Sequence, residues 1–344
     1  AMQTQQFAAM ETEQVAALTA RQIAAIETQD IAAWGSDQVQ ALTTSQLPAL
    51  TNYQVSRLTT TTLAALTTDQ IQALTPKAIS VLTPTQVSNL STDQVAALTT
   101  KQLQALTPTS ITALTTDQVS ALTTSQIVAL TGNQIKSLST SHMQALTTEQ
   151  LPALETRDVI LLTAGQLNAL TTDQVNSLTT SQVSSLTLNQ VSSLGLDQVG
   201  ALNTSQVAAL NSRQAQQLTG AQISVLSNEQ IVALETNDLG AMLANQITAF
   251  SPDQVAAMTT TQIAGLKRSQ VASLTNAQIT ALDTSQIAAI ETADISGLIG
   301  RQINVMSSDQ LQALTTSQLA AFSGTQFASI SVENISTVST AQIA

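Results

Sequence analysis

Apolar residues recur along this chain with a period of eight residues, without a single insertion or deletion. If the octad is lettered a to h, one apolar residue stands at c, as at Phe7, Val15 and Ile335, and another at f, as at Leu18 and Val338. The pattern runs through 43 octads in 344 residues. Because a short, constant period is typical of repeat proteins whose units pack only on their neighbours, it predicts a solenoid.

The spacing within the octad favours helices over strands. Residues c and f are three apart, so they share one face of a helix but lie on opposite faces of a strand. Many octads also carry a Thr/Ser pair at g and h, as in residues 117–124, which disfavours one continuous helix. The expected fold is therefore all-α, a superhelical solenoid of very short helices with one helix per octad.

Helix starts are marked by a capping box. Position g is Thr or Ser at 29 of the 42 places from Glu11 to Ser339, and position b, three residues later, is Gln in 34 of 43 octads. This is the Ser/Thr-x-x-Gln arrangement, in which each side chain satisfies a backbone N–H group of the other residue. We therefore expect g to be the N-cap and h the first helical residue.

The prolines follow the same scheme. Four of the six stand at h, where a helix has no use for an N–H group: Pro76, Pro84, Pro108 and Pro252. Pro48 and Pro152 stand at d, where an α-helix would use the N–H, so these two octads should be distorted or 3₁₀-like.

Four octads replace the box by two acidic residues. Each has Asp at b and Glu at the preceding g: Glu27 and Asp30, Glu155 and Asp158, Glu235 and Asp238, Glu291 and Asp294. The interpretation favoured by the pattern is an exchange inside the capping box, a longer side chain at one end and a shorter one at the other. Hard oxygen ligands also suit Ca²⁺, but two carboxylates are few for an ion that takes six to eight ligands.

Acidic residues at position a predict how the array winds. Counted in octads, their separations follow a 3-3-4 rhythm, which corresponds to roughly 27 residues per superhelical turn if the carboxylates form one acidic stripe. A duplicated 80-residue block would also give this rhythm, and a turn of this size also suits a β-solenoid, which stays the alternative fold. The twelve residues of the acidic stripe are Glu13, Asp37, Asp69, Asp93, Asp117, Glu149, Asp173, Asp197, Glu229, Asp253, Asp309 and Glu333.

Composition narrows the functional classes. The chain has no cysteine, its single histidine, His142, takes the place of a capping Gln at b, and nothing resembles a catalytic group, so we expect no enzyme, cofactor or metal centre. A net charge of −12 disfavours nucleic acid and anionic membranes, and no apolar run reaches transmembrane length. Weak binding of Ca²⁺ or a basic partner at the acidic stripe is possible on this pattern.

The Thr/Ser pairs at g and h raise a further alternative. Regular hydroxyl arrays on a solenoid can order water, so an ice-binding surface is a second functional alternative. Against it, the g hydroxyl is expected to be committed to the helix cap.

The unit Leu-Thr-Thr-x-Gln-(Val/Ile)-x-Ala-Leu, seen from Leu66 to Leu74, resembles octapeptide arrays of very large bacterial surface or secreted proteins of the adhesin-like type. The resemblance implies a non-catalytic spacer or stalk, an elongated rod at the cell surface or outside the cell, whose partners are neighbouring segments of the same protein. Residues 1–344 would form one continuous octapeptide-repeat solenoid, part of a longer array. The sequence does not indicate the oligomeric state or the superhelix handedness.

Overall fold

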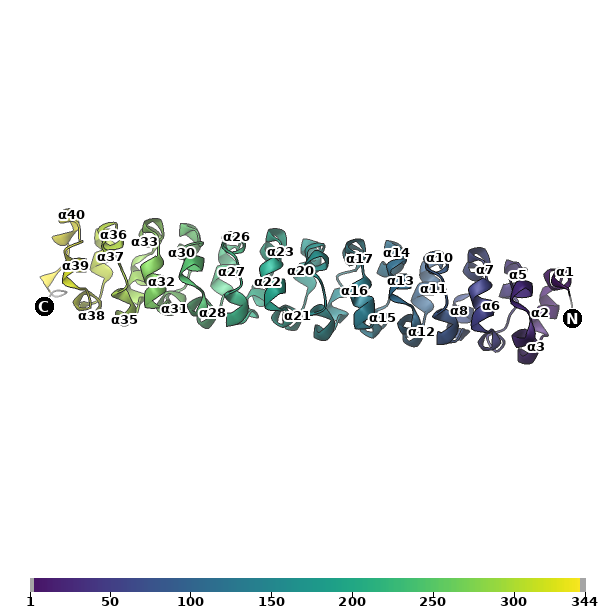
Figure 1. Ribbon diagram of the computed structural model, residues 1–344. Coiled ribbons are helices and arrows are strands. Elements are labelled where there is room, and N and C mark those ends of the chain that lie inside the picture. Colours follow the sequence, from purple (N-terminus) through teal and green to yellow (C-terminus); the bar gives the residue numbers. More distant parts are fainter. Residues whose placement is uncertain (1–2, 341–344) are drawn as a thin grey trace. The chain divides into compact units, whose positions relative to one another are not determined.

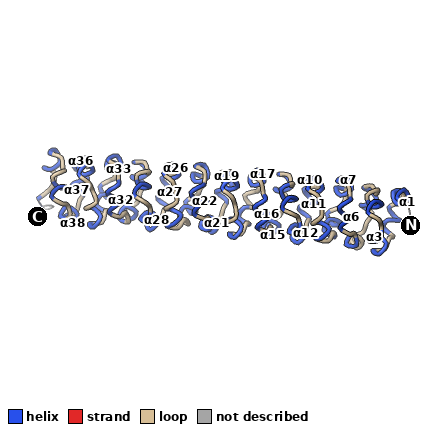
Figure 2. Tube along the Cα trace, in the orientation of Figure 1, coloured by secondary structure: helices blue, strands red, loops and turns tan. Residues whose placement is uncertain are grey.

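The computed structural model describes residues 3–340, and within this range every regular element is a helix (Figure 2). The α-helices contain four to six residues each, and two further elements are single 3₁₀ turns. The prediction of an all-α repeat solenoid is confirmed, and the β-solenoid alternative is wrong for the described residues.

The chain forms two compact units, Ala1–Ser177 and Leu178–Ala344, and each is a stack of superhelical turns (Figure 1). The octad register runs through both units without interruption. One continuous solenoid over residues 1–344 stays a prediction.

The elements of the first unit are α1 (Thr4–Ala8), α2 (Thr12–Ala16), α3 (Ala20–Ala25), α4 (Thr28–Ile31), α5 (Ser36–Gln40), η1 (Leu47–Ala49), α6 (Asn52–Arg57), α7 (Thr60–Ala64), α8 (Thr68–Ala73), α9 (Pro76–Ile79), α10 (Pro84–Ser88), α11 (Thr92–Ala97), α12 (Thr100–Ala105), α13 (Pro108–Thr112), α14 (Thr116–Ser120), α15 (Thr124–Ala129), α16 (Gly132–Ser137), α17 (Thr140–Ala145), η2 (Leu151–Ala153), α18 (Thr156–Val159), α19 (Ala164–Asn168) and α20 (Thr172–Ser177).

The elements of the second unit are α21 (Thr180–Ser185), α22 (Leu188–Ser193), α23 (Leu196–Gly200), α24 (Thr204–Ala208), α25 (Ser212–Ala215), α26 (Gly220–Ser224), α27 (Asn228–Ala233), α28 (Thr236–Ala241), α29 (Ala244–Ile247), α30 (Pro252–Ala257), α31 (Thr260–Ala264), α32 (Arg268–Ser273), α33 (Asn276–Ala281), α34 (Thr284–Ala289), α35 (Thr292–Ile295), α36 (Gly300–Asn304), α37 (Ser308–Ala313), α38 (Thr316–Ala320), α39 (Gly324–Phe327) and α40 (Val332–Ile335).

Each helix starts at h, as the capping box predicts, and the chain turns at f and g. In the octad of α16, the N-cap Thr131 has ψ of 155° and the C-cap Leu138 has ψ of 129°, so extended backbone on either side ends the helix. No described residue needs a positive φ or a cis peptide bond to make these turns. The chain therefore turns at every octad with ordinary L-residues.

The prolines lie where the sequence placed them. Pro76, Pro84, Pro108 and Pro252 are each the first residue of a helix. Pro48 and Pro152 lie inside the two 3₁₀ turns, η1 and η2. The distortion predicted for these octads is confirmed, because a 3₁₀ turn does without the N–H that proline lacks.

The helices pack on the helix three octads further along, as α8 does on α11, α12 on α15 and α30 on α33. The c and f side chains fill the core of each unit; Val119 and Leu122, for example, are 0% and 4% exposed. Aromatic residues join this core, since Trp34 and Phe250 are buried and Phe7 is half-buried. The core is thus one continuous apolar column within each unit.

Candidate functional site

The described residues contain no group of three or more acidic, His or Cys side chains that could hold a metal ion. Among residues 3–340, no helix has the length and apolar character that crossing a bilayer requires. The arrangement that recurs with most regularity lies at position b, so the site is built from that position.

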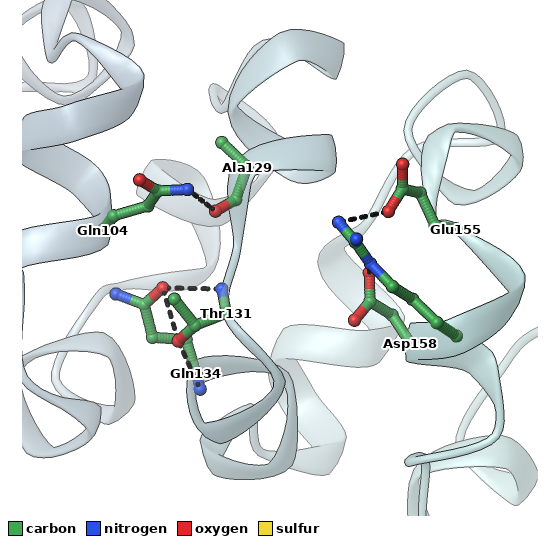
Figure 3. A network of polar contacts seen from close by, with 7 residues as sticks. Gln104, Ala129, Thr131, Gln134, Glu155 and Asp158 are labelled. Carbon is green, nitrogen blue, oxygen red and sulfur yellow. Dashed lines mark hydrogen bonds and ion pairs between the residues drawn. The ribbon is translucent and has the colours of Figure 1, made fainter.

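The capping box forms as predicted. At α16 the backbone N–H of Gln134 donates to Thr131 Oγ1 at 3.4 Å, and the backbone N–H of Thr131 donates to Gln134 Oε1 at 2.9 Å (Figure 3). Where g is not a capping residue, only the second half remains, as at Leu243, whose N–H donates to Gln246 Oε1 at 2.7 Å. The bond from the backbone N–H at g to the Gln side chain at b therefore does not depend on which residue stands at g.

The same glutamine also joins successive superhelical turns, a role that the capping interpretation missed. Gln134 Nε2 donates to the carbonyl oxygens of Leu103 at 2.8 Å and Leu106 at 2.9 Å, which lie four octads earlier in the chain. At Gln150 a third carbonyl joins, so that Nε2 lies 3.1, 3.1 and 2.6 Å from the oxygens of residues 119, 120 and 122. We call this group of c, d and f carbonyls the carbonyl cradle.

The sequence carried a signal for this contact. A capping box accepts Glu as readily as Gln at its third helical position, yet no octad has Glu at b. The Gln amide offers both an acceptor for the N-cap and a donor for the carbonyl cradle, whereas an ionised Glu offers only the acceptor.

Other donors replace Gln at b and keep the contact. His142 is buried, with Nε2 at 2.8 Å from the Leu114 carbonyl, and its Nδ1 accepts from the Ser139 N–H at 3.3 Å. Its predicted role as a substituted capping residue is confirmed. Asn334 Nδ2 likewise donates to the Met306 carbonyl at 2.8 Å.

A second contact runs in the opposite direction along the chain. Gln104, at position d, donates from Nε2 to the Ala129 carbonyl, 25 residues later, at 2.9 Å (Figure 3). Gln40 and Gln216 make the same bond to residues 65 and 241. Separations of 25 and of 28 to 31 residues bracket the roughly 27 residues predicted for one superhelical turn.

The Glu–Asp octads do not make the exchanged capping box, so that interpretation is wrong. None of the four Glu N-caps, Glu27, Glu155, Glu235 and Glu291, accepts a capping hydrogen bond. The physical reason is reach: the Asp side chain is one methylene shorter than Gln, and the Glu carboxylates find other donors. Gln29 Nε2 donates to Glu27 at 3.0 Å, and Arg157 pairs with Glu155 (Figure 3).

Three of the four Asp side chains of these octads are buried, and Asp294 is half-buried. Asp30, Asp158 and Asp238 are 3 to 4% exposed, and Asp30 Oδ1 and Asp158 Oδ2 have no hydrogen bond. Burial raises the pKa of Asp158, and the nearby Arg157 guanidinium, with Nε at 4.0 Å from Oδ2, only partly opposes this shift. These carboxylates are the least satisfied polar groups in the described structure.

The acidic stripe lies on the surface. All twelve of its residues are exposed. Stripe residues three octads apart lie on elements that pack together, as on α8, α11 and α14 and on α27 and α30. The pKa of Glu229 is lowered by hydrogen bonds from its own backbone N–H and from the Ser227 hydroxyl. A common line for all twelve, and any partner for them, stay predictions.

The consensus of this repeat decides the family. Read from e to b, the octad is Ala-Leu-Thr-Thr-x-Gln, and the model of the ALTTAQ repeat matches at residues 23–60, 63–100, 77–108, 100–132, 151–188, 231–268 and 287–324, more than half of the chain. The chain belongs to the ALTTAQ repeat family. No curated protein matches it. The predicted octapeptide-repeat character of this ALTTAQ protein is confirmed, while a bacterial, adhesin-like context stays a proposal.

Proposed function

We propose that this ALTTAQ protein is a non-catalytic spacer, a repeat stalk that holds other parts of a larger surface or secreted protein at a distance. The observation that carries the proposal is the contact from b to the carbonyl cradle. It ties each turn to the previous one with backbone acceptors that every octad offers, so octads can be added without a new kind of contact.

The bonds between turns favour a stiff array, which this role requires. Bonds from b and d cross from turn to turn in addition to the packing of c and f side chains. Since a bond to a backbone carbonyl does not depend on the partner's side chain, the contact survives sequence drift elsewhere in the octad. A spacer needs this combination of length, stiffness and tolerance.

Small-angle X-ray scattering tests the spacer function. Three proteins are compared: the chain itself, and versions with ten octads removed from or added to one unit in register. A spacer predicts that the maximum dimension changes by the same increment in each step, with a constant cross-section. Compaction, or a dimension that does not follow the octad number, would contradict the proposal.

The surface or extracellular location is tested separately. An antibody to the repeat should label intact cells of the organism that makes the protein as strongly as permeabilised cells. Labelling after permeabilisation alone would reject the location without touching the spacer function.

The acidic stripe supports a second candidate, a scaffold for basic partners, because its carboxylates are exposed on stacked helices. Polylysine should then bind the chain with an affinity that falls steeply with salt. Replacing Asp69, Asp93 and Asp117 by Ser should weaken this binding, and unchanged binding would dismiss the stripe as the site.

A further inference from the structure

The carbonyl cradle is built to hold a positively polarised group. In the octads with Gln at b, one Nε2 atom lies among up to three carbonyl oxygens of the previous turn; for Gln174 these are residues 143, 144 and 146, the first two at 2.9 and 3.1 Å. Three carbonyl oxygens near one nitrogen are also near one another. Without the amide, the converging carbonyl oxygens lose the side-chain donor that they share in the other octads.

The Asp octads remove that amide. By the register of Gln150 and Gln166 on either side, Asp158 faces the carbonyls of residues 127, 128 and 130. An ionised carboxylate has only acceptors to offer them. Asp158 is 3% exposed and its Oδ2 accepts no hydrogen bond. Asp30 also has an unpartnered Oδ1, but the positions 28 to 31 residues before it lie outside the described residues, so no carbonyl cradle is assigned to it.

A second carboxylate accompanies each Asp, and it does not cap the helix. All four Asp octads carry Glu at g, where 29 other octads carry Thr or Ser, so the two changes occur together. This change removes a helix cap, because Glu155 and the other three Glu residues accept no capping hydrogen bond. The paired change therefore has to be explained by what the two carboxylates do together.

We propose that the Glu–Asp octads of Asp158, Asp238 and Asp294 are calcium sites, in which the ion takes the place of the missing Gln amide in the carbonyl cradle. Backbone carbonyls and two carboxylates form a donor set of oxygen alone, and water or bidentate binding can complete the six to eight ligands of Ca²⁺. The ion balances the two negative charges. Mg²⁺ suits the site less, because it needs near-ideal octahedral geometry at shorter distances.

The three sites are not equivalent. Arg157 already pairs with Glu155, so its guanidinium competes with the ion there. The Glu235–Asp238 site has Asn237 at the corresponding place, and the Ser212 hydroxyl donates to Asp238 Oδ1 at 2.6 Å, which leaves the second carboxylate oxygen for a metal. Replacing Arg157 by Gln should therefore strengthen binding at Glu155–Asp158.

The test is thermal unfolding of the full chain in a chelator and then in about 5 mM CaCl₂ or MgCl₂. We expect CaCl₂ to raise the Tm by about 2 °C or more, and MgCl₂ to raise it less. A pair variant returns these three octads to consensus by Glu→Thr at residues 155, 235 and 291 and Asp→Gln at residues 158, 238 and 294. It should fold in the chelator and lose the CaCl₂ shift.

A stripe variant separates the Glu–Asp pairs from the charge of the acidic stripe. It removes four exposed carboxylates, D69S, D93S, D117S and D253S, and should keep the CaCl₂ shift. Absence of a shift in the native chain, or a shift that disappears in the stripe variant and persists in the pair variant, would overturn the proposal. Either result would leave the spacer function intact, since that function is judged by scattering.

Discussion

At the scale of the residue, position b has two tasks in one side chain. The amide oxygen of Gln134 closes the helix start, and its nitrogen reaches the previous turn. The sequence predicted the first task from the distance between g and b. It could not give the second, because the partners are backbone carbonyls 28 to 31 residues away, whose positions depend on the superhelix itself.

Replacing Gln134 by Glu separates these tasks. The Glu oxygen can still accept from Thr131 N–H, but the donor to Leu103 and Leu106 is lost and a carboxylate is buried against carbonyls. We expect a loss of about 2–3 kcal/mol in the free energy of unfolding, measured in urea. The control Thr131→Ala, which removes only a cap, should cost about 1 kcal/mol. Equal losses would indicate that capping is the only task of Gln134.

Asp158 should make stability depend on pH in an unusual direction. Because burial raises its pKa above the ordinary 3.8, the folded chain holds the proton more tightly than the unfolded chain. Its contribution to stability is fully present below pH 3.8 and is lost as pH rises through the folded-state pKa.

The variant Asp158→Gln, which restores the consensus donor, should therefore stabilise the chelated protein by about 1–3 kcal/mol at pH 7 and by less near pH 3.5. The exposed Asp117→Asn serves as control. A gain that is the same at both pH values would show that ionisation of Asp158 is not involved.

At the scale of the element, the sequence predicted nearly everything. Short helices, their starts at h, and the 3₁₀ turns at Pro48 and Pro152 all follow from local chemistry within one octad. The one failure, the exchanged box of the Glu–Asp octads, arose where the Asp side chain was too short to reach the N-cap amide. In the other octads local rules were sufficient, because the partners of the capping box are only three residues apart.

Proline placement in α14 tests the element scale. Thr116→Pro places proline at the first helical residue, as in α10, and should leave the free energy of unfolding unchanged or raise it by about 0.5 kcal/mol. Ser120→Pro places it at d and should cost about 3 kcal/mol. Urea unfolding of both variants measures the difference; an equal cost at the two positions would mean that the helix does not start at h.

At the scale of the whole molecule, the repeat period predicted turns of roughly 27 residues, and the contacts that cross between turns within each unit agree. The sequence could not predict the division at residues 177 and 178, because both sides carry the same octad pattern. Each octad is too small to be stable alone, so the stability of the solenoid is the sum of contributions from its stacked turns. The proposed spacer function depends on this additivity.

Deleting residues 115–122, one complete octad, tests this additivity. Every b side chain downstream keeps an f carbonyl four octads earlier, so the Tm should change by about 2 °C or less. Deleting only residues 115–118 moves c and f out of the core for the rest of the unit and should lower the Tm by more than about 10 °C. Similar effects of the two deletions would contradict a strict octad register.

The most direct test of the central claim, that b amides hold successive turns together, is hydrogen exchange of glutamine side-chain amides followed by NMR. Gln134, Gln150 and the other buried b glutamines should exchange about a hundredfold or more slowly than the exposed Gln72 at position d. Exchange of the b amides at the rate of Gln72 would contradict the claim.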